Sequence, residues 1–228
     1  MRILMVLTSC DRLGDSGPKT GFRLEEFAAA YYVLGDAGAD ITLASPDGGQ
    51  PPMDPRSGRL GRQSEAVTRF KGDAAARTAL ADTLWLGQVV PQDFDAAFYV
   101  GGHGTVQDLA DDPISRAIIA ALHSAGRTIA LVGHGPAALR GAIDADGRLL
   151  VRGRHVTATA NSEEAATGLG EFLPFLLEDE LIRLGAFYSK GPDWESHVVR
   201  DGVLITGQNA SSATDTARAL IDALAQLA

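Results

Sequence analysis

The chain has 228 residues, enough for one large domain with a substantial core. Apolar residues make up 45% and charged residues 21%, which is typical of globular proteins and argues against a largely disordered chain. The net charge of −9 repels phosphate backbones, and no apolar run approaches the roughly 20 residues of a membrane span. We therefore expect neither a nucleic-acid nor a membrane partner. The single cysteine, Cys10, excludes an internal disulfide and favours a reducing, cytoplasmic location.

Apolar runs of strand length alternate with helical patterns along the chain. The expected strands are short, rich in β-branched residues and apolar nearly throughout, as strands buried on both faces should be, and they cover residues 3–8, 40–44, 96–100 and 128–132. The expected helices cover residues 20–35, the segment from the Asp112-Pro113 start signal to Gly126, and residues 211–227. This alternation predicts a mostly parallel sheet with helices on both faces, in one α/β domain over residues 1–228.

Two stretches depart from the alternation. Residues 46–92 contain a proline-rich turn region and then a polar helix at about 73–82. We interpret them as an excursion from the sheet that serves as a lid or as a dimer element. Residues 198–205 carry alternating apolar residues on both sides of Asp201-Gly202, a strong signal for a two-residue β-hairpin turn.

The most informative segment is Val132-Gly133-His134-Gly135-Pro136, directly after an expected buried strand. A strand that enters a helix through a tight turn is typical of a nucleophile elbow. The tip here is Gly133, which avoids a backbone strain of about 1–3 kcal/mol but brings no side-chain atom. On the pattern alone, an ordinary glycine-rich turn is an equally good interpretation.

A second glycine-rich segment, Gly101-Gly102-His103-Gly104, follows another expected strand. Ligands of open α/β sheets bind beyond the carboxyl ends of the strands, so both segments should border one pocket. Gly102, His103 and Gly135 are the candidates for its oxyanion-binding wall. The segment has neither the lysine of a P-loop nor a dinucleotide fingerprint, and we expect no cofactor.

Glu26 lies within a helical stripe of apolar residues. Its neighbours at i−4, i+3, i+4 and i+7 are apolar, namely Phe22, Ala29, Ala30 and Val33. A carboxyl group in such a stripe should have a raised pKa, which suits a general acid or base. The alternative is a glutamate that stabilises a helix start through the dipole or an ion pair.

Four segments, in order, carry a family resemblance: Lys19-Thr20-Gly21 with Glu26, Gly101 to Thr105, Val132 to Ala137, and Asp201 to Asn209. Together they resemble the DJ-1/PfpI superfamily, which belongs to the class I glutamine amidotransferase-like proteins, and within it the Hsp31-like branch. The resemblance implies a flavodoxin-like, doubly wound sheet and a homodimer. Members of the branch include holding chaperones and glutathione-independent glyoxalases, which convert methylglyoxal to lactate.

The resemblance also implies a catalytic set. The family glutamate falls on Glu26, the histidine on His134, and a second acid of glyoxalase-type members on Glu164. The family cysteine falls on Gly133, so the nucleophile position is vacant. Glyoxalase, protease and amidase chemistry in the family needs this thiol, and none of them can proceed unchanged here.

Three functional hypotheses follow. The first is an enzyme that uses Glu26, His134 and Glu164 for acid–base chemistry on a small carbonyl or enol substrate, as a lyase, hydratase or isomerase. The second is a non-catalytic holding chaperone or binding protein. The third is a glyoxalase or an amidase/protease silenced by an engineered change from cysteine to glycine at position 133.

Two further residues are candidates for the pocket. Cys10 lies just past the first expected strand, and we expect an inert cysteine there rather than a substitute nucleophile. Trp194, just before the predicted hairpin, is a candidate for the pocket rim. The sequence has no His-x-x-x-His pair and no Cys/His cluster, so the spacing predicts no metal site.

Overall fold

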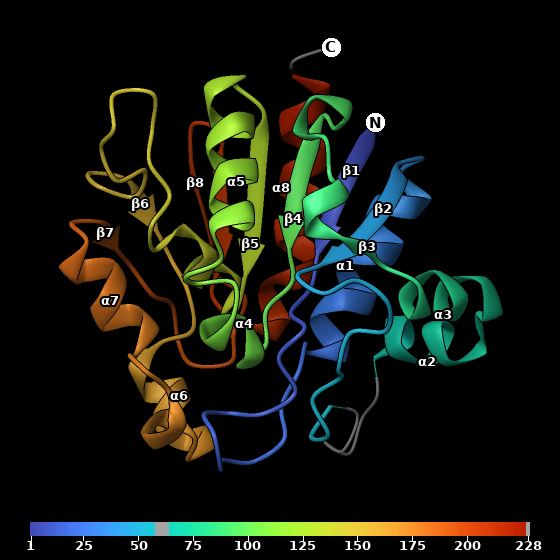
Figure 1. Cartoon of the computed structure of the whole chain (residues 1–228), viewed down its shortest axis with the longest axis horizontal. Coiled ribbons are helices and arrows are strands. Elements are labelled where there is room, and N and C mark those ends of the chain that lie inside the picture. The colour runs from blue at the N-terminus through green and yellow to red at the C-terminus, as the bar shows by residue number, and fades with distance from the viewer. Residues whose placement is uncertain (58–63, 227–228) are drawn as a thin grey trace.

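The computed structural model describes residues 1–57 and 64–226. Residues 58–63 of the predicted excursion, and residue 227 of the predicted final helix, lie outside the described residues. A seven-stranded sheet runs through the middle of the molecule in the order β3-β2-β1-β4-β5-β9-β8 (Figure 1). The strands are β1 Arg2–Val6, β2 Asp40–Ser45, β3 Leu84–Trp85, β4 Ala96–Tyr99, β5 Thr128–Val132, β8 Val198–Asp201 and β9 Leu204–Gly207. A separate two-stranded sheet pairs β6 His155–Val156 with β7 Phe187–Tyr188.

Helices cover both faces of the large sheet. The helices of the described residues are α1 Leu24–Asp36, α2 Glu65–Gly72, α3 Ala74–Ala81, α4 Gly104–Gln107, α5 Pro113–Ser124, α6 Asn161–Thr167, α7 Leu177–Arg183 and α8 Ala213–Ala225. Helix α5 covers one face of the sheet, and α1 and α8 cover the other. All neighbouring strands of the large sheet are parallel except β8, which runs antiparallel to β9. The predicted doubly wound, flavodoxin-like α/β fold is therefore confirmed.

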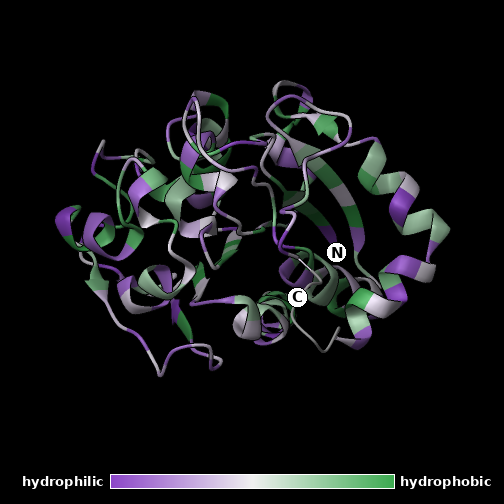
Figure 2. Ribbon diagram, turned by 90° about the horizontal axis from the view of Figure 1, so that it is seen from below, coloured by the Kyte–Doolittle hydropathy of each residue, from purple (hydrophilic) through white to green (hydrophobic). Residues whose placement is uncertain are grey.

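The core forms two layers because successive strand residues point to opposite faces of the sheet. In β1, Leu4 and Val6 join the cluster beneath α5, whereas Ile3 and Met5 join the cluster beneath α1 and α8. The strands at the centre of Figure 2 are accordingly coloured mostly as hydrophobic. No helix within the described residues is long and apolar enough to cross a membrane.

The predicted helix at 20–35 starts late. Residues before Leu24 are extended, and Phe22 forms a parallel bridge with Met53. A Cβ on Gly21 would lie 2.0 Å from the carbonyl oxygen of Pro52, so the two backbones are in close contact there. This non-local pairing holds the chain extended where the local pattern favours a helix.

The predicted excursion at 46–92 is only partly separate from the sheet. The polar helix is present as α3, but α2 precedes it and was not predicted, and β3 pairs with the edge of β2. Val67 of α2 and Leu80 of α3 are buried in the cluster that contains α1. The predicted hairpin is present, with Gly202 at φ +61° between β8 and β9.

Candidate functional site

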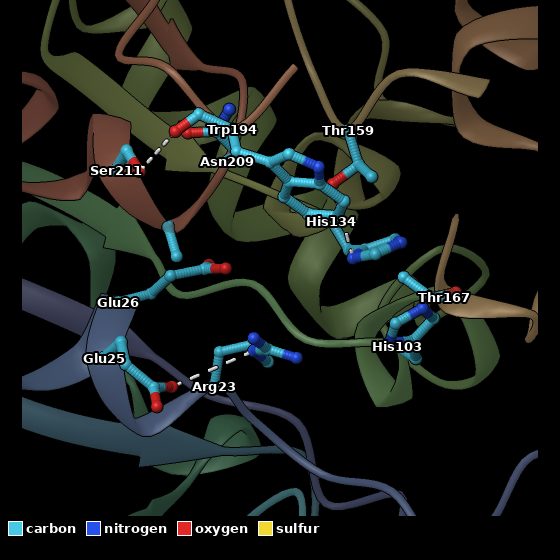
Figure 3. A pocket seen from close by; sticks show the side chains of 11 residues that line it. Arg23, Glu25, Glu26, His103, His134, Thr159, Thr167, Trp194, Asn209 and Ser211 are labelled. Carbon is cyan, nitrogen blue, oxygen red and sulfur yellow. Dashed lines mark hydrogen bonds and ion pairs between the residues drawn. The ribbon is translucent and has the colours of Figure 1, made fainter. Parts of the chain in front are cut away.

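A cavity of about 350 Å³ opens beyond the carboxyl ends of β4, β5 and β9 (Figure 3). Its polar wall includes Glu26 and Arg23 from the start of α1, His103 after β4, and His134 after β5. Thr159, Thr167, Trp194, Asn209 and Ser211 are also in the wall. Parallel strands bring these segments to one edge of the sheet, as predicted from the sequence.

The elbow at Gly133 is a tight, left-handed turn with φ +60°. Its amide donates to the carbonyl of Gly207 at 2.9 Å, and its carbonyl accepts from the amide of Thr159 at 3.1 Å. A 3-10 helix over Gly135–Leu139 follows it. The turn thus has the position and the backbone conformation of an elbow, held from both sides by neighbouring segments.

The Glu26 carboxylate lies in the space that an elbow side chain would need. A Cβ built on Gly133 would be 2.7 Å from Oε1 and 2.8 Å from Oε2 of Glu26. The amide of Gly101 donates to Oε2 at 3.0 Å. Glu26 is 3% exposed, and this burial raises the pKa of its carboxyl group to about 7, against the opposing effect of the nearby Arg23 charge. Glu26 is therefore able to carry or release a proton near neutral pH.

His134 is oriented by the second predicted acid, Glu164. Its Nε2 lies 2.7 Å from Oε2 of Glu164, and its Nδ1 lies 3.4 Å from the Thr159 hydroxyl. Both His134 and Glu164 are buried. A histidine held by a carboxylate through one nitrogen and presenting the other to a cavity is the arrangement of a general base with its orienting acid.

The same carboxylate also binds His103. Nε2 of His103 lies 2.8 Å from Oε1 of Glu164, and the Thr167 hydroxyl donates to that oxygen at 2.8 Å. Burial lowers the pKa of His103 to about 4, and the neighbouring His134 adds to this. Burial works to raise the pKa of Glu164, but hydrogen bonds from the two histidines outweigh it and hold the pKa well below its usual value. Glu164 is thus an anion and His103 is neutral at pH 7.

His103, His134 and Glu164 are also the one group of potential metal ligands found within the described residues. Each offers one ligand atom, and the atoms of His103, His134 and Glu164 lie within 4.8 Å of one another. Spacing along the chain does not reveal this group, because its members come from three separate segments.

The hydrogen-bond pattern favours an ionic network over a metal centre. Nη2 of Arg56 lies 3.4 Å from Nδ1 of His103. A guanidinium can only donate, so we assign Nδ1 as the acceptor and place the ring proton on Nε2, where it binds Glu164. A metal at Nε2 needs the opposite tautomer.

A third buried glutamate, Glu163, holds the opposite wall of the cavity together. Its Oε1 accepts from the Trp194 amide at 2.8 Å and from Nδ2 of Asn209 at 2.7 Å. Its Oε2 accepts from the Ala160 amide at 3.0 Å. Trp194 has φ +65° and is 52% exposed, at the predicted rim.

Other predicted candidates lie away from the cavity wall. A Cβ on Gly102 would lie 2.3 Å from the Gly21 carbonyl, and one on Gly135 would lie 2.7 Å from the Tyr99 carbonyl. Both glycines therefore allow close backbone packing behind the site. Cys10 bonds through its Sγ to the Arg12 carbonyl at 3.0 Å, and burial raises the pKa of its thiol.

Sequence reasoning missed several wall residues, chiefly Arg23, Thr159 and Thr167. Arg23 precedes the predicted acid Glu26 by three residues, or about one helical turn, so the helical spacing offered a signal for it. The two threonines offered none, because they reach the site only through the path of the chain after β6.

Residues 19–223 match the DJ-1/PfpI family. The glutathione-independent glyoxalase HSP31 of Saccharomyces cerevisiae is 30% identical over 234 residues, which is 98% of each chain. Among solved structures, the rapid encystment protein of 24 kDa from Francisella tularensis has a TM-score of 0.92 and 34% identity over 98% of each chain. Glyoxalase III of Candida albicans has a TM-score of 0.89 and 27% identity, covering 98% of this chain and 97% of its own.

The full-length match, the sheet order and the motifs around the cavity agree with one another. This chain belongs to the DJ-1/PfpI family.

Proposed function

We propose that this protein is a cysteine-independent enzyme that moves protons on a small carbonyl or enol substrate, as a lyase, hydratase or isomerase does. The observation that carries the proposal is the place of the Glu26 carboxylate, which occupies the space above Gly133. A group with a pKa of about 7 thus faces the cavity at the point where the family resemblance puts a thiol. His134, oriented by Glu164, lies in the same wall.

A carbonyl substrate is supported by the names of the relatives, which include a glutathione-independent glyoxalase and a glyoxalase III. A covalent thiol route needs a side chain that Gly133 does not have. The remaining polar groups of the site exchange protons, and proton transfer by positioned side chains accelerates reactions by about 10²–10⁴-fold.

The protonation states suggest the direction of transfer. His134 donates from Nε2 to Glu164, so its Nδ1 lone pair accepts a carbon-bound proton next to the substrate carbonyl. Neutral Glu26 donates its proton to the carbonyl oxygen, and the C–H electron pair becomes the C=C bond of an enol. Glu164 stabilises the imidazolium that forms. With a 2-hydroxy carbonyl substrate the intermediate is an enediol: His134 returns its proton to the former carbonyl carbon, the second hydroxyl gives its proton to Glu26, and an isomerisation is complete. With a leaving group on the carbon beyond the deprotonated one, the enol hydroxyl returns its proton to Glu26, the C=O bond reforms, and the leaving group is expelled in an elimination.

Deuterium exchange tests the proton transfer without knowledge of the product. We expect the wild-type protein to catalyse exchange of the carbon-bound protons of hydroxyacetone in D₂O, followed by NMR. Glu26→Gln and His134→Ala should each lower the exchange rate by about 10²-fold or more. His123→Ala, at the end of α5, is the control and should keep the wild-type rate. Exchange that both site variants leave undiminished would refute the proposal.

The same assay defines a pH dependence. Because Glu26 acts in its protonated form, kcat/KM should fall as the pH rises above about 7. The Glu26→Gln protein should lose this alkaline limb together with most of its activity. A rate that increases steadily from pH 7 to pH 9 would assign the opposite role to Glu26.

An engineered loss of the cysteine makes a different prediction. If Gly133 merely silences a glyoxalase, Gly133→Cys should restore conversion of methylglyoxal. We expect no such gain, because the proposed chemistry uses Glu26 and His134 and does not need a thiol at position 133. A holding chaperone, in turn, would suppress client aggregation equally well with Glu26→Gln and His134→Ala.

A further inference from the structure

Arg23 brings a positive charge into the wall of the cavity. It occupies the N-cap position of α1, without a side-chain capping hydrogen bond, and lies three residues before Glu26. Its amide donates to the Gly101 carbonyl at 2.9 Å, and the Gly101 amide donates to Glu26. Gly101 therefore fixes the positions of both Arg23 and Glu26. In Figure 3 the Arg23 guanidinium points into the cavity, on the side of His103.

This charge is largely removed from water but only weakly compensated. The Arg23 side chain is 21% exposed. Its one ion pair within the described residues joins Nε to Oε2 of Glu25 at 3.9 Å, which is longer than a hydrogen bond. Removing a guanidinium from water costs free energy unless oxygen acceptors replace the water.

The other carboxyl groups near Arg23 are engaged elsewhere. Asp54 is bound at both oxygens by Arg56, at 3.0 Å from Nε and 2.5 Å from Nη2. Glu26 accepts from the Gly101 amide, and its pKa of about 7 leaves it partly neutral at neutral pH. Glu164 is held by the two histidines. None of these carboxyl groups makes an ion pair with Arg23 within the described residues.

Resting on the proposed function, we propose that Arg23 binds a carboxylate of the substrate, which is therefore a small monoanionic carbonyl compound of the 2-oxo acid type. A guanidinium presents two parallel N–H donors that match a carboxylate. Arg23 is the one arginine or lysine in the described wall of the cavity. One cation in the wall suits a single negative charge better than the double charge of a phosphate ester.

In the complex, the carboxylate at Arg23 places the adjacent carbonyl between Glu26 and His134. The anion also disfavours ionisation of Glu26, which keeps the proton that the proposed transfer requires. Arg23 is thus a binding and specificity residue, whereas Glu26 and His134 are the groups that move protons.

Binding of pyruvate and of its neutral analogue pyruvamide tests the inference. The two probes have nearly the same shape and differ in charge. We expect calorimetry or NMR titration to show that Arg23→Met weakens pyruvate binding at least tenfold and changes pyruvamide binding less than twofold. Arg77→Met, which removes an exposed arginine of α3, is the matched control and should affect neither probe.

Three other results of the binding experiment would overturn the inference or part of it, and a second variant decides if the first does not fold. Equal binding of pyruvate to wild-type and Arg23→Met protein, or no binding of pyruvate to the wild type, overturns the inference. Tighter, Arg23-dependent binding of dihydroxyacetone phosphate overturns the choice of a carboxylate. If Arg23→Met does not fold, Arg23→Lys decides: it should weaken pyruvate binding several-fold and leave pyruvamide binding unchanged.

The titration can be repeated in Glu26→Gln, where we expect most of the turnover to be lost. Arg23-dependent pyruvate binding there, combined with undiminished hydroxyacetone exchange in Glu26→Gln and His134→Ala, would uphold the carboxylate site and refute the proposed chemistry. Loss of hydroxyacetone exchange in the two site variants, combined with pyruvate binding that does not depend on Arg23, would uphold the proposed chemistry and refute the carboxylate site.

Discussion

At the scale of single residues, Glu26 and position 133 share one small volume. The carboxylate oxygens of Glu26 lie closer to the Cβ position of Gly133 than ordinary van der Waals contact allows. The glycine also permits the φ of +60° at the elbow without strain. The Glu26 carboxylate therefore lies against a position that carries no side chain.

Gly133→Ala should reveal both effects. We expect a loss in the free energy of unfolding of roughly 1–3 kcal/mol, from the left-handed backbone and from contact with Glu26. In a Glu26→Ala background the steric part should disappear, leaving a smaller loss. Gly168→Ala is the control, because Gly168 has φ +67° but nothing within 4 Å of its Cβ position. Denaturant unfolding measures the wild type and the four variants, and equal losses in both backgrounds would contradict the shared volume.

Glu26 should also make the stability of the fold depend on pH. Burial raises its pKa from 4.5 to about 7 on folding, so the folded state binds this proton more tightly than the unfolded state does. The resulting stabilisation is fully present below about pH 4.5 and is lost as the pH rises to about 7. The raised pKa corresponds to about 3 kcal/mol.

Glu26→Gln removes this titration. We expect the variant to be more stable than the wild type at pH 8 and of similar stability at pH 5, as measured by urea unfolding. Glu171→Gln, at an exposed position, should follow the wild-type pH dependence. A difference between wild type and Glu26→Gln that is the same at both pH values would argue against a buried, protonated Glu26.

At the scale of elements, local signals define some helices and tertiary contacts define others. Helix α5 begins where Asp112-Pro113 predicts it, and the Asp112 Oδ1 accepts from the Ser115 amide at 2.6 Å. Helix α1 begins at Leu24 only because the preceding residues pair with the segment that contains Met53. A capping side chain is a local cause, whereas this pairing joins segments about thirty residues apart.

Asp112→Ala tests the local cause. Loss of an N-cap acceptor leaves a helix amide without a partner and typically costs about 1 kcal/mol. We expect a decrease of that size in the free energy of unfolding, measured by chemical denaturation. Asp82→Ala, at an exposed position just after α3, should change it by less than half as much. A similar loss in both variants would show that the Asp112 cap adds nothing specific.

At the scale of the whole molecule, the cavity depends on segments that are distant in the sequence. Glu163 joins Ala160, Trp194 and Asn209 by three hydrogen bonds. Because Glu163 is completely buried, its removal leaves donors without acceptors in the interior.

Glu163→Ala should therefore destabilise the protein by roughly 2–4 kcal/mol. It should also increase the mobility of Trp194, which fluorescence anisotropy can report in a Trp85→Phe background, since the chain has two tryptophans. Glu178→Ala, in the first turn of α7, is the comparison, and it tests whether the loss of another glutamate has the same effect. Unchanged Trp194 anisotropy in Glu163→Ala would contradict a role for Glu163 in holding the wall.

The family resemblance leads us to propose a homodimer with a small-molecule substrate. Sedimentation equilibrium should then give twice the chain mass of 23.9 kDa. A single species at the mass of one chain across micromolar concentrations would refute the dimer.

Features with local physical causes could be predicted from the amino-acid sequence alone. Apolar runs identified β1, β2, β4 and β5, because strands buried on both faces must exclude polar residues. The Asp201-Gly202 turn, the cap at Asp112 and the ordered motifs of the family were also readable from the chain. Short elements such as β3 and β6 were not, because two residues carry no periodic pattern.

The arrangement of the site depends on long-range packing that local sequence patterns do not reveal. Glu164 lies between His103 and His134, and the Glu26 carboxylate lies over Gly133, because the parallel strands and the segment after β6 bring these residues to one edge of the sheet. Burial at that edge, rather than residue type, raises the pKa of Glu26 and lowers that of His103. The sequence showed which groups are present, and their packing out of water sets their protonation.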